Sequence, residues 1–133
     1  MIPIADPDVG AAARAGVDAV FDDGQLADGE EVRRFESEFA DFCGTDRAVA
    51  TTNGTTALHA GMEALGVGDG DAVVTTPFSF VASANAIAHA GATPVFADID
   101  PETLTLDPAA VEAVLNERDD VAAILAVHLY GTP

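Results

Sequence analysis

The chain has 133 residues, 49% of them hydrophobic, and carries 23 acidic against 5 basic residues, which gives a formal net charge of −18. This length is that of one ordinary domain with a core of its own, and no apolar run approaches the roughly 20 residues that a membrane helix needs. The charge excludes nucleic acid and anionic membranes as partners, because their phosphate groups repel a surface of this sign.

All 5 basic residues are arginines, so lysine is absent. The carboxylates are spread along a chain that is too apolar for a disordered acidic segment. Such a surface is typical of halophilic proteins, in which salt screens the self-repulsion. We expect a soluble, cytoplasmic protein, since no basic, apolar leader precedes the first motif. Cys43 is the single cysteine, which excludes a disulfide framework and predicts a small buried hydrophobe.

The first elements are a loop and a helix. The polar, glycine-containing stretch "FDDGQLADGEE" (21–31) predicts a loop. The next stretch, 30–44, predicts a helix that ends at Gly44, because its apolar residues recur at spacings of three, four and three. These residues are Val32, Phe35, Phe39 and Phe42.

The remaining chain alternates between strands and helices. Strands are expected at 47–52, 72–77, 93–100 and 121–130, and helices at 55–66, 79–91 and 107–117. Asp107 is the expected N-cap of the last helix, and Pro108 its first residue. This order predicts an α/β fold with a mostly parallel sheet, right-handed crossovers and helices on both faces. The chain stops soon after its most hydrophobic strand, so we expect a fragment of a longer protein.

A candidate anion site lies at the turn in "ATTNGTTALH" (50–59). Gly54 allows close approach of the backbone, and Thr55 and Thr56 add hydroxyl donors to amides that have no partner inside the helix. The turn with Asn53 can equally be an N-cap without a ligand. Neither a Walker A lysine nor a Gly-x-Gly-x-x-Gly run is present, which argues against a nucleotide-binding domain.

Other polar and aromatic residues are further candidates for a ligand site. Phe78 and Phe80 follow the strand 72–77, and each can be a core residue or a stacking platform for a planar ring. Asp98 and Asp100 favour a solvated turn, because a metal would need more ligands. The histidines show no metal-binding spacing, and His59 and His89 are expected at the surface or between helices. His128 ends the last predicted strand, where it could face the site.

Three ordered segments resemble one enzyme family. They are "GEEVRRFESEFADFCG" (29–44), "ATTNGTTALHAGMEALGVGDGDAVVTTPFSFVASANAIAHAGATPVFADIDPETLTLD" (50–107) and "AVHLYGTP" (126–133). Nearly the whole chain is similar to the N-terminal part of DegT/StrS-type nucleotide-sugar aminotransferases, which depend on pyridoxal 5'-phosphate. The resemblance implies the N-terminal portion of the large domain of a fold-type I enzyme. Residues 1–45 would form a helical segment with an active-site and dimer loop, and residues 46–133 an incomplete cofactor-binding domain.

The resemblance also assigns roles to residues. Gly54, Thr55 and Thr56 match the positions that hold the cofactor phosphate, and Phe80 matches the aromatic that stacks on its ring. The loop from Gly24 to Gly29 matches a segment near the active site at the dimer interface. The family moves an amino group, generally from glutamate, to a keto carbon of a nucleotide-linked sugar, in the synthesis of amino sugars for surface glycans.

The chain departs from the family in one respect. The family's Schiff-base lysine lies beyond the point at which this chain ends, and so does the aspartate that pairs with the pyridinium nitrogen. The 133 residues alone are therefore expected to be inactive, with no catalytic residue among them and no metal site, while a full-length version would be a homodimeric enzyme. Two alternatives stay open: a dehydratase of the same family, or a non-catalytic binding remnant.

Overall fold

The computed structural model describes residues 5–133. The chain falls into two compact units, Met1–Ala50 and Thr51–Pro133. This boundary lies slightly beyond the one expected at 45/46, and the roles expected for the two parts stay predictions. Among the described residues, no helix combines the length and the apolar character that crossing a membrane requires.

The first unit consists of two helices, α1 (Ala11–Asp23) and α2 (Glu30–Cys43). The sequence interpretation did not include α1, and it placed the start of the loop within its last turn. The helix ends at Gly24, whose left-handed φ of 79° lets its N–H reach the carbonyl of Val20. The predicted end of α2 is confirmed: Gly44 follows with a φ of 68° and donates its N–H to Asp41.

The apolar stripe of α2 exists, but it is not buried within this unit. Its rings follow one another along the helix, with centroids 5.6 Å apart for Phe35 and Phe39 and 6.4 Å apart for Phe39 and Phe42. All three phenylalanines are exposed, Phe42 to 86%. The prediction that Cys43 is buried is wrong, since Cys43 is exposed at the end of the helix. Ala40 is the buried residue of α2. The helical spacing of the apolar residues therefore did not show which side of α2 is buried.

The strand predicted at 47–52 is also wrong, because this stretch is irregular. A strand needs a neighbouring strand for its backbone groups, and 47–52 pairs with none in the described part of the chain. The backbone N–H of Ala50 instead donates to Oε1 of Glu36 at 2.8 Å. Val49 is 82% exposed, although its residue type favours strands.

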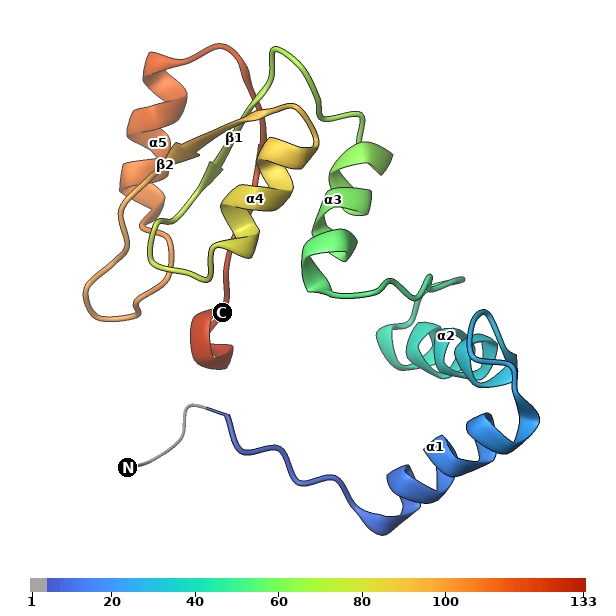
Figure 1. The fold of residues 1–133 in the computed structure, drawn as a ribbon. Helices are drawn as coiled ribbons and strands as arrows, with labels where there is room; N and C mark the ends of the chain where they lie inside the picture. Colours follow the sequence, from blue (N-terminus) through green and yellow to red (C-terminus); the bar gives the residue numbers. More distant parts are fainter. Residues whose placement is uncertain (1–4) are drawn as a thin grey trace. The chain divides into compact units, whose positions relative to one another are not determined.

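The second unit is the predicted α/β sheet with alternating helices (Figure 1). Its elements are α3 (Gly54–Ala64), β1 (Ala72–Thr75), α4 (Ala82–His89), β2 (Thr93–Phe96), α5 (Pro108–Glu117), β3 (Val121–Ile124) and the 3-10 turn η1 (Leu129–Gly131). The strands are parallel and lie in the order β2-β1-β3, with β1 in the middle. The parallel pairing and the α/β class are confirmed.

Strand β1 is covered on both faces, as predicted for the sheet. Val73 packs in a cluster with Met62 of α3 and Ile87 of α4. The next residue, Val74, points to the other face and packs against Val111 of α5. Figure 1 shows α4 and α5 on opposite sides of the sheet. All of β1 is buried, so it forms the centre of the core.

The outer strands are shorter than the sequence predicted. β2 ends at Phe96, and the chain continues as a turn in which Oδ1 of Asp100 accepts the N–H groups of Glu102 and Thr103. This confirms the solvated turn expected there. The start of α5 is confirmed as well, since Oδ1 of Asp107 accepts the N–H of Ala109 at 2.9 Å.

Candidate functional site

A shallow pocket of about 610 Å³ opens where α3 and α4 begin. It lies toward the carboxyl ends of the parallel strands, because both helices run antiparallel to β1 (Figure 1). This is the edge at which α/β proteins bind ligands. The pocket is lined by Asn53, Gly54, Thr55, Ala57, Leu58, Phe80 and Ala82.

The turn before α3 leaves two backbone donors for a ligand. Asn53 is the N-cap, and its Oδ1 accepts the N–H of Thr56 at 2.9 Å. Its carbonyl accepts the N–H of Ala57 at 3.1 Å. The first N–H groups of a helix have no partner inside it, and those of Gly54 and Thr55 meet no acceptor in the described part of the chain. The turn is therefore a capped helix start that still presents two amides.

The two threonines of the turn have different surroundings. Thr55 lines the pocket. The hydroxyl of Thr56 donates to Oδ1 of Asn53 at 3.1 Å and lies 3.3 Å from the hydroxyl of Thr52. Thr56 does not line the pocket. The structure thus brings Gly54, Thr55 and Phe80 together at one pocket, whereas Thr56 is exposed and hydrogen-bonded to the cap residue Asn53.

Neither aromatic of the segment after β1 belongs to the core. Phe80 is 76% exposed and Phe78 is 44% exposed. Phe80 lines the pocket, whereas Phe78 does not. The sequence interpretation did not single out the side chains that complete the apolar wall, Ala57 and Ala82, because small apolar residues carry no chemical signal of a site.

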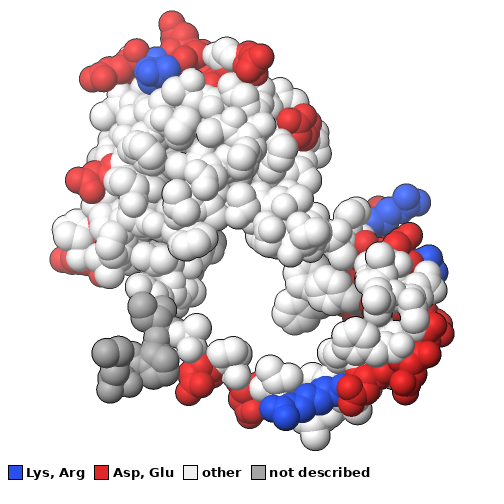
Figure 2. Space-filling view, in the orientation of Figure 1, with Lys and Arg blue, Asp and Glu red and all other residues white. Residues whose placement is uncertain are grey.

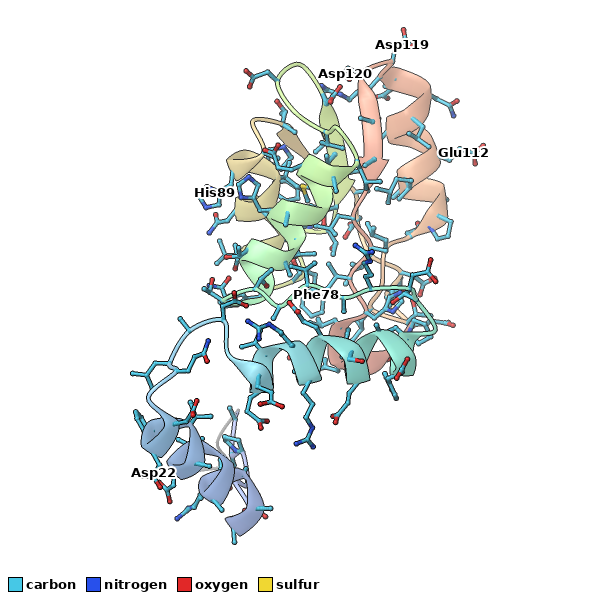
Figure 3. All side chains as sticks on the ribbon, turned by 90° about the vertical axis from the view of Figure 1, so that its right-hand side faces the viewer. Asp22, Phe78, His89, Glu112, Asp119 and Asp120 are labelled. Carbon is cyan, nitrogen blue, oxygen red and sulfur yellow. The ribbon has the colours of Figure 1, made fainter. Side chains whose placement is uncertain are left out.

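The pocket is free of charge in a unit that is strongly acidic. Arg118 is the single arginine of Thr51–Pro133, and its Nε and Nη2 donate to the two carboxylate oxygens of Asp120 at 2.9 and 2.6 Å. This hydrogen-bonded pair lowers the pKa of Asp120. It joins α5 to β3, at the opposite edge of the sheet from the pocket. In Figure 3, Asp119 and Asp120 lie at one end of this unit and Phe78 at the other.

The remaining polar candidates do not line this pocket. His59 of α3 and His89 of α4 lie with their ring centroids 5.9 Å apart, which confirms a role between helices. Nε2 of His59 is 3.4 Å from a carboxylate oxygen of Glu63. His128 is exposed at the start of η1. No group of three histidine, cysteine or carboxylate side chains suited to a metal occurs in residues 5–133.

Comparison with known proteins identifies the family. Residues 7–133 match the model of the DegT/DnrJ/EryC1/StrS aminotransferase family. GDP-perosamine synthase of Caulobacter vibrioides is 48% identical over 103 residues, which are 77% of this chain and 27% of that protein. The chain belongs to the DegT/DnrJ/EryC1/StrS aminotransferase family, so the predicted resemblance is confirmed.

Solved structures agree with this assignment. An aminotransferase of Psychrobacter cryohalolentis is 38% identical, with a TM-score of 0.88, over 98% of this chain and 33% of that one. A sugar aminotransferase of Streptococcus pneumoniae is known in its PLP and PMP forms. It is 29% identical, with a TM-score of 0.90, over 99% of this chain and 33% of that one. The chain is thus the N-terminal portion of a fold-type I architecture and spans about a third or less of these relatives, and pyridoxal phosphate is the cofactor of the family.

Proposed function

We propose that the pocket at the start of α3 holds pyridoxal 5'-phosphate, with Gly54 and Thr55 at the phosphate and Phe80 at the ring. The complete enzyme would transfer an amino group from glutamate to a nucleotide-linked keto-sugar, in the cytoplasm and as a homodimer. One observation carries the proposal: Phe80 lines the same pocket as Gly54 and Thr55, from which it is distant in sequence, in a chain of this family.

The residues present fit such a cofactor. The unpartnered amides of Gly54 and Thr55 and the Thr55 hydroxyl are donors for a phosphate. The exposed ring of Phe80 and the side chains of Ala57 and Leu58 offer apolar contact for an aromatic ring. The donors and the apolar surface thus match the two parts of a phosphorylated pyridine.

When bound, the cofactor supplies an electron sink for moving amino groups. The residues of this chain bind and orient it. Asn53 fixes the helix start through Thr56, so that the amides of Gly54 and Thr55 point outward from α3. Since the chain contains no lysine, we expect the 133 residues to bind the cofactor without amino-transfer activity of their own. An assay with pyridoxal phosphate, glutamate and a nucleotide-linked keto-sugar should yield no aminated sugar.

Binding is best measured with pyridoxamine 5'-phosphate, by calorimetry or by its fluorescence. This ligand carries the phosphate and the ring but no aldehyde that could react with other amines. Replacing Thr55→Val removes a hydroxyl donor to a charged group and keeps the shape of the side chain. We expect the dissociation constant to rise about tenfold or more.

Thr93→Val is the matched control. Thr93 is the exposed first residue of β2, at the amino end of the strand, and valine suits a strand. The Thr93→Val protein should bind pyridoxamine 5'-phosphate as the unchanged protein does. Equal affinities of the Thr55→Val and Thr93→Val proteins would contradict the placement of the phosphate.

A further inference from the structure

We propose that this pocket holds the cofactor phosphate with neutral donors only, so that added salt strengthens binding of the phosphate instead of weakening it. The inference rests on the proposed function and adds to it how the site responds to its ionic surroundings. It follows from where the charges of Thr51–Pro133 lie.

The only arginine of this unit does not line the pocket. Arg118 follows α5 and is held by Asp120 through two hydrogen bonds, 2.6 and 2.9 Å long. That pair lies before β3, at the amino edge of the sheet, whereas the pocket lies toward the carboxyl edge. The arginine is thus both paired and remote, so it does not neutralise a phosphate in the pocket.

The pocket itself offers a ligand only neutral groups. None of its lining residues carries a charge. Backbone amides and a hydroxyl can hold a phosphate at a helix start without a basic side chain. The donors at Gly54 and Thr55 therefore give the short-range attraction, and no cation of this unit adds a long-range one.

The charge that surrounds the pocket is negative. Asp98 and Asp100 follow β2 at the same carboxyl edge of the sheet as the pocket. Figure 2 shows acidic side chains around the rim of this unit, with an uncharged face between them. The chain as a whole carries −18. A phosphate dianion that approaches the pocket is therefore repelled at long range.

Salt acts on the repulsion and leaves the close contacts in place. The screening length falls from about 10 Å in 0.1 M salt to about 3 Å in 1 M salt, whereas the amide contacts act at hydrogen-bond distance. A site built on lysine or arginine loses affinity for phosphate over this range, because its attraction is screened. This pocket should gain affinity.

The test compares two ligands, pyridoxamine 5'-phosphate and pyridoxamine, which differ only in the phosphate. Their dissociation constants are measured in 0.1–1 M sodium chloride, and circular dichroism identifies the salt range over which the protein stays folded. The ratio of the two constants isolates the phosphate from any effect of salt on folding or on the ring. We expect the preference for the phosphorylated ligand to rise about two- to fivefold across this range.

Two lysine variants sharpen the test. Ala57→Lys places a cation at the pocket wall, and Ala113→Lys places the same charge on the exposed side of α5. The first should strengthen binding of the phosphorylated ligand in 0.1 M salt and reverse its salt dependence. The second should keep the salt dependence of the unchanged protein.

The outcomes separate this inference from the proposed function. A preference for the phosphorylated ligand that stays constant or falls with salt would overturn the inference, since a cationic side chain would then reach the phosphate, and would leave the cofactor site standing. No preference at any salt concentration would overturn both. A preference that rises with salt, and that Ala57→Lys reverses, supports both.

Discussion

Oδ1 of Asn53 accepts two hydrogen bonds from Thr56, one from the backbone N–H at 2.9 Å and one from the hydroxyl at 3.1 Å. One carboxamide oxygen therefore caps α3 and also accepts the hydroxyl of Thr56, which does not line the pocket. The resemblance assigned the phosphate to both threonines, but their contacts differ. Thr55 lines the pocket, whereas Thr56 is hydrogen-bonded to the cap residue Asn53.

Replacing Asn53→Ala should lower the free energy of unfolding by about 1 kcal/mol, because the cap of α3 is lost. The measurement is urea unfolding followed by circular dichroism. Asn53→Ser is the control, since a serine hydroxyl can accept the same N–H and should retain most of the stability. Equal loss in both variants would show that the carboxamide contributes through something other than the cap.

Removing Arg118 should raise the pKa of the Asp120 carboxyl group. Its hydrogen bonds with Arg118 hold that pKa below its usual value, so the pair stabilises the fold above the pKa of the unfolded chain. That stabilisation is lost as pH falls through the lower pKa of the folded state. In Arg118→Gln, a carboxyl titration by NMR should show the pKa of Asp120 close to that of an ordinary aspartate. The difference in the pKa of Asp120 between the unchanged protein and Arg118→Gln should be smaller in 1 M salt, because the pair is exposed.

Ile87 is fully buried in the cluster between α3, α4 and β1. Ile87→Ala should lower the free energy of unfolding by about 2–5 kcal/mol, and Ile87→Val by about 0.5–1.5 kcal/mol. Leu65 of the same helical layer is 78% exposed, so Leu65→Ala is a control that should cost far less. Similar losses at positions 87 and 65 would contradict the core described for this unit.

The features predicted correctly from sequence depend on neighbouring residues in the chain. Asp107 caps α5 and Pro108 begins it because a side-chain oxygen and a fixed φ act within one helical turn. Gly44 ends α2 for a similar local reason. The helix start at Gly54 was predicted in the same way, and the anion assigned to its unpaired amides stays a prediction.

The features missed depend on what lies opposite a residue in space. Val49 has a side chain suited to a strand, yet it pairs with no strand in the described part of the chain. Phe35 and its helical neighbours form an apolar face that this unit leaves exposed. At the site, the strand order placed Phe78 and Phe80 near the same sheet edge as the turn, and only the family resemblance singled out Phe80, which lines the pocket.

The position of β1 also bears on the order in which this fold can be completed during synthesis. The ribosome makes β1 before the other two strands, yet β1 lies between them. The neighbouring strand β2 is complete once Phe96 has been added, and the neighbouring strand β3 is complete only after Ile124 has been added. β1, which is fully buried in the folded unit, therefore has one side unpaired while α5 is translated. During that interval a nascent chain of this protein most needs protection from other chains.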